Sequence, residues 1–371
     1  METHLHVISF DVPYPPTYGG VIDVYYKIKA LHAKGVKVHL HCFQYGREES
    51  TQLDTLCETV RYYPRNVSRS QLFGRLPYIV VSRQSEPLVQ ELLKDDYPIL
   101  FEGLHTCGIL DDERLINRFK VVRTHNIESD YYRSLAKVEK NVFKRYYFHN
   151  EASKLEQFEP VLAKANAIAA ISRNDTDYFD KKYKNAYYIT AFHSNEKINI
   201  KSGRGKFAFY HGNLAVGENN EAALFLVNKV FSSSDIPLIV AGSRPTKELQ
   251  QAVEKKDHIT LLSDLSTRQI HQLINDAQVN VLPTFQPTGI KLKLLSALYN
   301  GRFAVVNTPM VENTGLEDLC LVADDASGFK AMVEDVMSRD FTEEQILQRE
   351  KILRSSFSND INVQKLINLI S

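Results

Sequence analysis

Short runs of consecutive apolar residues alternate with longer amphipathic segments along almost the whole chain. Most of the short runs lack a strict apolar–polar alternation, which is typical of parallel strands that are covered by helices on both faces. The amphipathic segments between them would supply the helical crossovers. The strands predicted from this pattern are His4–Phe10, Val36–Phe43, Tyr78–Val81, Ile99–Phe101, Lys120–Thr124, Ala167–Ile171, Ala186–Ile189, Lys206–Tyr210, Pro237–Ala241, Ile259–Leu262, Val279–Leu282, Phe303–Val306 and Cys320–Val322.

The strands and helices form two successive series, which meet in the polar stretch Phe192–Gly205. A chain of 371 residues is also longer than the roughly 250–300 residues at which a single hydrophobic core stops growing. We therefore expect an N-terminal Rossmann-like domain over residues 1–195 and a C-terminal one over residues 206–345. Residues 346–371 are expected to be C-terminal helices. The predicted helices include Asp130–Ala165, which is the longest, Thr342–Phe357 and Ile361–Ile370.

Charge and cysteine content exclude several classes of protein. Lysine and arginine together number 45, as do aspartate and glutamate, and this balance argues against a chain built to coat nucleic acid. The four cysteines form no CxxC pair, so neither a disulfide framework nor a structural zinc site is expected. The chain opens directly on a strand pattern, and no apolar run approaches the ~20 residues of a membrane span. We expect a soluble, cytoplasmic protein.

The first candidate for chemistry is the pair Gly19 and Gly20, which ends a proline-rich loop after the first predicted strand. A helix is predicted to follow over Val21–Leu31. Glycines at such a position let the backbone approach a phosphate or a sugar closely, and the helix N-terminus favours negative charge. The pattern fits an ordinary proline–glycine turn equally well.

The second candidate lies where two predicted strands end. His125 follows the strand Lys120–Thr124, and Glu102 and His105 follow the strand Ile99–Phe101. The carboxyl ends of parallel strands face the ligand crevice, so these three side chains are candidate catalytic residues. His125 would act as a hydrogen-bond donor or as a general base. The alternative is a structural cluster in which Asn126 or Ser129 caps the next helix.

The strongest candidate is the predicted helix that follows the strand Val279–Leu282. It opens on Thr288 and Gly289, and Lys293 comes about one turn later. Backbone N–H groups, the helix dipole and an ammonium would together form a cradle for a diphosphate. The alternative is a solvated lysine on a surface helix. The predicted binding residues of this segment are Thr288, Gly289, Ile290, Lys291, Lys293 and Ser296.

A helical projection separates two faces of this helix. The core face is expected to hold Ile290, Leu294, Leu295, Ala297 and Leu298, and the opposite face Lys293, Ser296 and Asn300. A second wall of the site is predicted from the loop with Gly212 and Asn213, which follows a strand and precedes a helix over Glu221–Val230 with Asn219 as its expected cap. An ordinary strand-to-helix turn is the alternative for this loop.

Taken in order, these segments resemble the family 4 retaining glycosyltransferases of GT-B fold, over nearly the whole chain. The matching motifs are Pro-Pro-x-x-Gly19-Gly20, Thr124-His125-Asn126-x-Glu128, Ala170-Ile-Ser172, Tyr210-His-Gly212 through Asn219 and Ala222, and Gly289-Ile-Lys-Leu-Lys293-Leu-Leu-Ser296-Ala297. The resemblance implies two Rossmann-like, doubly wound parallel-sheet domains that face each other across a cleft, with C-terminal helices that cross back. It also implies that no metal and no cofactor is needed beyond the nucleotide-diphosphate sugar that serves as donor.

The resemblance gives roles only to the matching positions. Gly20 would lie against the donor phosphates or sugar, His125 would meet the transferred sugar, and Lys293 would hold the diphosphate. Two positions depart from the family pattern. Ser296 stands where the family commonly has a glutamate for the nucleotide ribose, and Thr288 where many members carry an earlier glutamate that faces the sugar. These departures leave the identity of the donor open.

The function expected from the resemblance is transfer of a sugar, with retention, onto a saccharide or lipid-linked acceptor in bacterial polysaccharide or glycolipid assembly. One alternative is a GT-B sugar-nucleotide epimerase, which would need carboxylates such as Glu102 and Glu128. Another is a catalytically silent nucleotide-sugar-binding subunit, which the departure at Ser296 suggests. Weak peripheral membrane contact through Arg133–Lys154 is a further hypothesis, because that segment interleaves basic and aromatic residues. The competing interpretation is a crossover helix in which Glu139, Glu151 and Glu156 dilute the basic charge.

Overall fold

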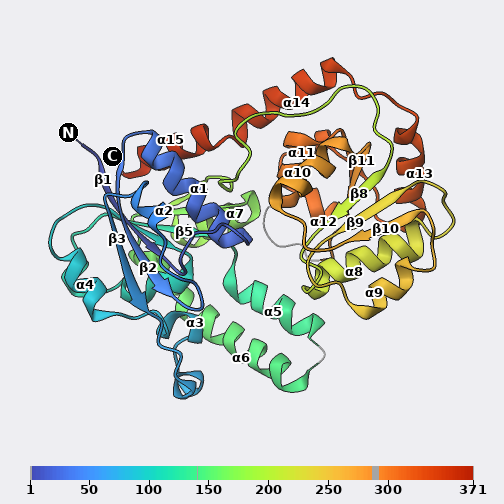
Figure 1. Ribbon diagram of the computed structural model, residues 1–371. Coiled ribbons are helices and arrows are strands. Elements are labelled where there is room, and N and C mark those ends of the chain that lie inside the picture. The colour runs from blue at the N-terminus through green and yellow to red at the C-terminus, as the bar shows by residue number, and fades with distance from the viewer. Residues whose placement is uncertain (1, 140, 286–291, 371) are drawn as a thin grey trace. The chain divides into compact units, whose positions relative to one another are not determined.

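The computed structural model describes residues 2–139, 141–285 and 292–370 (Figure 1). The chain divides into two compact units. The first unit comprises Met1–Ser194 together with Phe357–Ser371, and the second comprises Asn195–Ser356. Each unit is built on one parallel sheet with helical crossovers, as the continuous apolar runs predict.

The sheet of the first unit has the strand order β3-β2-β1-β4-β5-β6-β7, and each pairing is parallel. The strand order reverses between β1 and β4, and open parallel sheets commonly bind ligands at such a point. The strands are β1 (His4–Ser9), β2 (Lys37–Gln44), β3 (Thr59–Pro64), β4 (Ile99–Glu102), β5 (Lys120–Thr124), β6 (Ala167–Ala170) and β7 (Ala186–Tyr188).

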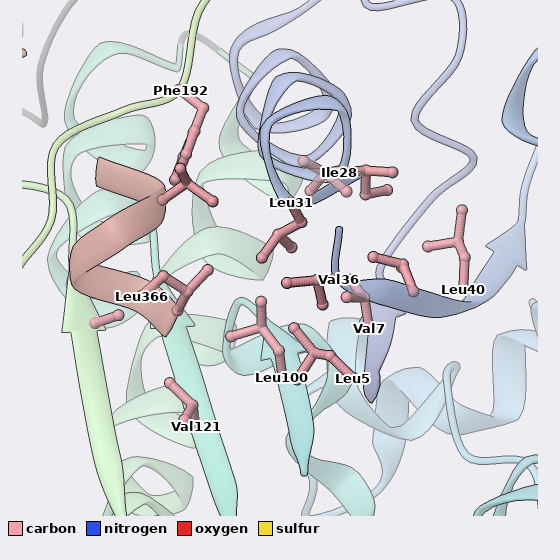
Figure 2. Packing of buried hydrophobic residues seen from close by; sticks show 14 of the residues in the cluster. Leu5, Val7, Ile28, Leu31, Val36, Leu40, Leu100, Val121, Phe192 and Leu366 are labelled. Atoms are coloured by element: carbon pink, nitrogen blue, oxygen red, sulfur yellow. The ribbon is translucent and has the colours of Figure 1, made fainter. Parts of the chain in front are cut away.

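Hydrophobic clusters cover both faces of this sheet. On one face, Leu31 of α1 (Gly19–Ala33) and Leu366 of α15 (Asn359–Ile370) pack with Leu100 of β4, and Figure 2 shows these side chains. The chain therefore returns to the first unit at its C-terminal end. The other face is covered by α3 (Tyr78–Val81), α4 (Glu86–Leu92), α6 (Val142–Phe158) and α7 (Arg173–Tyr183).

The sheet of the second unit has the order β10-β9-β8-β11-β12-β13 and is parallel throughout. Its strands are β8 (Ala208–His211), β9 (Leu238–Ala241), β10 (Ile259–Leu262), β11 (Val279–Leu282), β12 (Phe303–Val306) and β13 (Leu321–Val322). Its helices are α8 (Gly217–Phe225), α9 (Lys247–Val253), α10 (Thr267–Asp276), α11 (Leu292–Asn300), α12 (Thr308–Val311), α13 (Ala326–Met337) and α14 (Glu343–Ser356).

One strand prediction is wrong, and one strand was not predicted. Tyr78–Val81 forms the short helix α3 and not a strand, because periodicity cannot separate a buried helical turn from a strand in a run this short. The Tyr78 N–H donates to the carboxylate of Glu151 on α6 at 2.6 Å, which fixes the start of this turn. Thr59–Pro64 is an unpredicted edge strand. It carries an arginine and ends in proline, so it lacks a continuous apolar run.

The predicted long helix over Asp130–Ala165 is three shorter elements. The chain forms α5 (Glu128–Val138), then α6, and then a 3₁₀ segment over Glu159–Lys164. Asn141 starts α6 as its N-cap, with its side-chain oxygen accepting from the N–H groups of Phe143 and Lys144. A capping asparagine within an amphipathic run therefore marked a helix boundary. In the described part of the chain, no helix is both long and apolar enough to cross a membrane.

Candidate functional site

Five charged or ionisable side chains form a buried cluster in the first unit, which we call the charged cluster. Asp23 and Lys27 come from α1, Glu102 from the end of β4, Arg123 from β5, and His125 from the residue after β5. Asp23, Lys27, Glu102 and Arg123 are at most 1% exposed. The strand ends and the first helix therefore bring polar chemistry to the carboxyl edge of the sheet.

Asp23 is the centre of the charged cluster. Its carboxylate accepts from Lys27 Nζ at 2.9 Å, from Arg123 Nη2 at 2.9 Å and from the backbone N–H of Phe192 at 2.8 Å. Lys27 also donates to Glu102 Oε1 at 2.6 Å. Two carboxylates and two cations neutralise one another, which is the condition for burying charge at a tolerable cost.

His125 reaches the same carboxylates. Its Nε2 lies 3.3 Å from Asp23 Oδ2 and 3.5 Å from Glu102 Oε2. Burial alone would lower the pKa of His125, but its interactions with Asp23 and Glu102 outweigh burial and raise that pKa above its ordinary value. A raised pKa favours the protonated ring, so these contacts favour His125 as a hydrogen-bond donor over a general base.

Asp23, Glu102 and His125 also offer ligand atoms that lie within 4.8 Å of one another, as a metal site requires. However, Lys27 and Arg123 already bind the two carboxylates. A divalent cation would have to displace an ammonium or a guanidinium that is itself buried. The donor set therefore suits an ion-pair network better than a metal ion.

His105 and Glu128 lie beside the charged cluster. His105 Nδ1 is 3.9 Å from Glu128 Oε1 and has no hydrogen-bond partner among the described residues. Burial, with smaller contributions from Arg83 and His125, holds the pKa of His105 well below its ordinary value. Burial raises the pKa of Glu128 to about 7, although the nearby His125 opposes that shift. Glu128 thus changes its charge near neutral pH.

Gly19 and Gly20 open α1 next to this region. Tyr18 at the N-cap makes no side-chain capping hydrogen bond. A Cβ atom at Gly20 would lie 2.6 Å from the ring of Phe10, so glycine is needed here for the helix to approach that ring. Phe10 in turn contacts the rings of His105 and His125, with centroids 5.3 and 5.7 Å away. The structure therefore places the glycine pair of the first candidate close to His105 and His125 of the second candidate.

A second cluster of polar side chains lies in the second unit, at the end of β8. Lys293 Nζ on α11 donates to Asn219 Oδ1 at 3.0 Å and lies 5.5 Å from the ring centroid of Tyr210. Asn219 Nδ2 donates to the carbonyl of Asn213 at 3.1 Å. A Cβ atom at Gly212 would lie 3.0 Å from the side chain of Asn219. The predicted second wall and Lys293 are therefore neighbours in space.

Neighbouring strand ends hold this loop in place. Ser243, after β9, donates through its hydroxyl to Asn213 Oδ1 at 3.1 Å. Asn307, after β12, binds both the N–H and the carbonyl of Thr284, which follows β11. The hydroxyl of Thr284 donates to the carboxylate of Glu218. The carboxyl ends of the central strands thus form one hydrogen-bonded rim.

Several expectations for α11 can be compared with its structure. Leu294, Leu295, Ala297 and Leu298 are buried as predicted, and Lys293 and Ser296 are partly exposed. Asn300 was expected on the polar face but is buried, with Nδ2 donating to Asn195 Oδ1 at 2.8 Å. The remaining predicted binding residues, Thr288, Gly289, Ile290 and Lys291, lie outside the described residues.

Two capping predictions are wrong. The helix after β8 begins at Gly217, so Asn219 lies in its first turn and instead bonds to Lys293 and to the Asn213 carbonyl. The helix after β5 begins at Glu128 without a side-chain cap, and neither Asn126 nor Ser129 serves as one.

Sequence reasoning missed Asp23, Lys27 and the role of Arg123. Asp23 and Lys27 are four residues apart on the helical face that also carries Val24 and Ile28. Two opposite charges inside an apolar helical stripe are the signal that could have identified them.

The solved structures that resemble this chain agree with one another on its fold. No family model matches the chain. The sequence is 26% identical, over 83% of this chain and 84% of the relative, to an uncharacterised 44.6 kDa protein in the cps region of Klebsiella pneumoniae. Among solved structures, TarM matches with a TM-score of 0.68 and 9% identity, covering 100% of this chain and 99% of its own.

Two further structures agree with TarM. A glycosyltransferase from Rickettsia africae matches with a TM-score of 0.66 and 11% identity over 100% of this chain and 97% of its own. Anabaena HepE, solved with UDP-glucose, matches with a TM-score of 0.65 and 14% identity over 98% of both chains. At these identities the likeness concerns the fold. The chain thus has the GT-B fold, as predicted: two Rossmann-like units, each with its own parallel sheet, followed by a C-terminal helix that returns to the first unit.

Proposed function

We propose that the protein is a glycosyltransferase that moves a sugar from a nucleotide-diphosphate sugar to a saccharide or lipid-linked acceptor. The observation that carries this proposal is the position of Lys293 beside the Gly212–Asn213 loop in the second unit. A fold shared over nearly the full length with a glycosyltransferase from Rickettsia africae, and with HepE, which was solved in complex with UDP-glucose, supports it.

The chemistry of the transfer fits these residues. Breaking the bond between the sugar carbon and the phosphate oxygen leaves negative charge on the diphosphate. A fixed ammonium and backbone N–H groups stabilise that charge most when they are held in place before the reaction. Lys293 is held by Asn219, so it would not need to be reorganised. In the first unit, a protonated His125 would donate a hydrogen bond to the substrate.

The finer parts of the proposal are retention at the transferred carbon, independence of metal and a role in polysaccharide assembly. Retention rests on the resemblance to family 4 enzymes. Metal independence is supported by the charged cluster, because Lys27 and Arg123 already neutralise Asp23 and Glu102. A role in polysaccharide assembly is supported by the relative in the cps region of Klebsiella pneumoniae.

Product analysis tests the proposal. The purified protein is incubated with UDP-, GDP- and ADP-sugars and candidate saccharide acceptors, with a chelator present throughout. We expect one donor to give a nucleoside diphosphate together with an extended acceptor. Failure to bind any nucleotide sugar would contradict the proposal.

The same experiment separates the two alternatives. An epimerised donor without acceptor extension would indicate an epimerase, for which Glu128 is a suitable acid or base because its pKa is raised to about 7 by burial. Binding without turnover would indicate a silent subunit.

A further inference from the structure

Four of the chain's 12 histidines lie on two neighbouring strands of the first unit. They are His4 and His6 on β1 and His39 and His41 on β2, and we call them the histidine row. Side chains two residues apart on a strand point to the same face. Ile8, the next residue on this face of β1, packs in the hydrophobic cluster that α4 covers. The histidine row therefore continues an apolar face of the sheet with ionisable side chains.

The four rings form one continuous series. Ring centroids are 5.3 Å apart for His4 and His39, 5.1 Å for His39 and His6, and 5.1 Å for His6 and His41. Tyr97, from the loop 94–98 before β4, stacks on His4 with centroids 4.3 Å apart. His6 is 3% exposed and His41 is 2% exposed. A positive charge on either of these two rings would therefore lie beside another imidazole and away from water.

A chain of hydrogen bonds crosses the histidine row and is complete when both inner rings are neutral. His6 Nε2 lies 3.0 Å from the carboxylate of Asp95, which can only accept, so this nitrogen carries a proton. In the neutral ring His6 Nδ1 accepts from His41 Nε2 at 2.8 Å, and His41 Nδ1 accepts from the Tyr63 hydroxyl at 2.9 Å. A proton added to either ring would remove an acceptor that a neighbouring donor now uses.

The carboxylates near the histidine row already have other partners. Asp95 accepts from Arg118 Nη2 at 3.1 Å, so a second cation at His6 would have to share its charge. The other acidic groups that act on the row are Glu58, which pairs with Lys37 at 3.2 Å, Glu91, which pairs with Arg61 at 3.6 Å, and the exposed Glu2, which lies 4.0 Å from His4. Positive charge on the buried rings would therefore be poorly compensated.

Burial lowers the pKa of these histidines. It holds the pKa of His41 well below its ordinary value, and His6 and His39 lower that pKa further. It also lowers the pKa of His6, against the opposing effect of Asp95, and the pKa of His39. A histidine in the unfolded chain has a pKa of about 6.5. As the pH falls below that value, the unfolded chain binds protons that the folded row does not, so the free energy of unfolding decreases.

We propose that the histidine row is an acid-sensitive latch. At neutral pH its hydrogen bonds tie the loop 94–98 to β1 and join the side chains of β1, β2 and β3. Proton uptake breaks these bonds and places like charges on neighbouring rings, so this part of the first unit opens. The inference goes beyond the proposed function and does not rest on it, because the latch needs no donor and no acceptor.

Magnetic resonance of the full chain with isotope-labelled histidine tests the hydrogen bonds directly. We expect the rings of His6 and His41 to stay neutral, with the proton on Nε2, from about pH 8 to about pH 5.5. The same chain unfolded in urea should titrate its histidines near pH 6.5. A doubly protonated His6 or His41 at neutral pH would overturn the proposal, because the row would then be an ion pair with Asp95.

The paired variant His41→Leu with Tyr63→Phe removes both partners of one hydrogen bond in the chain. From about pH 7 to about pH 5, the folding equilibrium constant of the wild type should fall about 25-fold further than that of the variant. This factor is the proton binding of one unfolded histidine with a pKa of about 6.5. Urea denaturation at both pH values measures it. Only the change with pH is compared, so a lower stability of the variant at neutral pH does not affect the result.

The matched control is His32→Gln, which removes an exposed histidine from α1 and should keep the wild-type change with pH. Hydrogen exchange of the full chain locates the opening. After correction for intrinsic rates, amides of the loop 94–98 and of β1 to β3 should exchange faster at about pH 5 than at about pH 7 in the wild type. An equal change with pH in the wild type and the paired variant would overturn the latch, as would acid-dependent opening confined to other parts of the chain.

Discussion

At the scale of single residues, the charged cluster explains why one substitution in the first unit should strongly lower the free energy of unfolding. Asp23 is 1% exposed and accepts from both Lys27 and Arg123. Removing its charge would leave a buried guanidinium without its compensating carboxylate. The penalty for such an uncompensated charge exceeds the net contribution of the intact ion pair.

We therefore predict that Asp23→Asn lowers the free energy of unfolding by about 3–5 kcal/mol, measured by urea denaturation. The matched control is Asp130→Asn. Asp130 pairs with Arg133 on the surface of α5, where both side chains are well exposed, so its loss should cost at most about 1 kcal/mol. Equal effects of the two substitutions would show that the charged cluster is not buried in solution.

For Glu128 we expect the opposite effect, because removing its charge should raise the free energy of unfolding. Its pKa is raised to about 7 by burial, with Asp175 adding to the shift and His125 and Arg83 opposing it. The unfolded chain has a glutamate pKa near 4.3. Above about pH 7 the folded state must hold a buried carboxylate that the unfolded chain keeps in water, so Glu128 lowers stability there.

Glu128→Gln should accordingly stabilise the protein by up to about 3 kcal/mol above pH 7, and this advantage should disappear as the pH falls from about 7 to about 4. Urea denaturation of both proteins across this range measures the difference. A residue kept at a cost to stability is expected to serve function, so the stabilised variant should turn over more slowly. Destabilisation at neutral pH would instead mean that the carboxylate is well paired.

At the scale of elements, the first unit depends on a helix from the far end of the sequence. Val363, Leu366 and Ile370 of α15 are buried in the same cluster as the core residues of α1 and of the sheet (Figure 2). Asn359 also binds both the N–H and the carbonyl of His193. The core of the first unit therefore includes side chains from α15.

Leu366→Ala tests this dependence. Leu366 is 1% exposed, so the substitution should lower the free energy of unfolding by about 2–5 kcal/mol through lost burial and a cavity. Leu347→Ala on α14 is the matched control, because Leu347 is 65% exposed and its loss should cost less than about 0.5 kcal/mol. Thermal or urea denaturation compares the two. A small effect at Leu366 would mean that α15 does not complete this core.

The elements also show what the sequence can and cannot predict. Continuous apolar runs such as Val279–Leu282 and Phe303–Val306 predict buried parallel strands correctly, because burial on both faces leaves a pattern in the chain itself. Tyr78–Val81 fails because a four-residue run fits a helical turn as well as a strand. Which strands neighbour one another depends on contacts between distant residues, and no local pattern contains them.

In the candidate site, too, local sequence patterns identify some residues, whereas contacts between distant residues cannot be read from them. His125 and Lys293 could be identified from the sequence because polar residues that follow buried strands in a parallel sheet face its ligand edge. Asp23 and Lys27 were missed, although two opposite charges within the apolar stripe of α1 were a signal. Their contact with Arg123, a hundred residues away, could not be predicted because it depends on tertiary packing. The pairing of Asn219 with Lys293, 74 residues apart, is likewise a product of tertiary packing.

At the scale of the whole molecule, the candidate functional residues are distributed over two units. The first holds the charged cluster with His125, and the second holds Lys293 at the ends of its central strands. We propose that the second unit binds the donor. The central claim is therefore that Lys293 holds the diphosphate of a nucleotide.

Calorimetric titration of wild type and Lys293→Ala with UDP, GDP and ADP tests this claim most directly, with Lys247→Ala as the control for loss of an exposed lysine. We predict that one nucleotide binds the wild type and the control equally. Its affinity for Lys293→Ala should fall by about 1.5–3 kcal/mol, or about 10- to 150-fold, the contribution of a hydrogen bond to a charged group. An unchanged affinity in Lys293→Ala, with its melting temperature also unchanged, would contradict the assignment of the donor site.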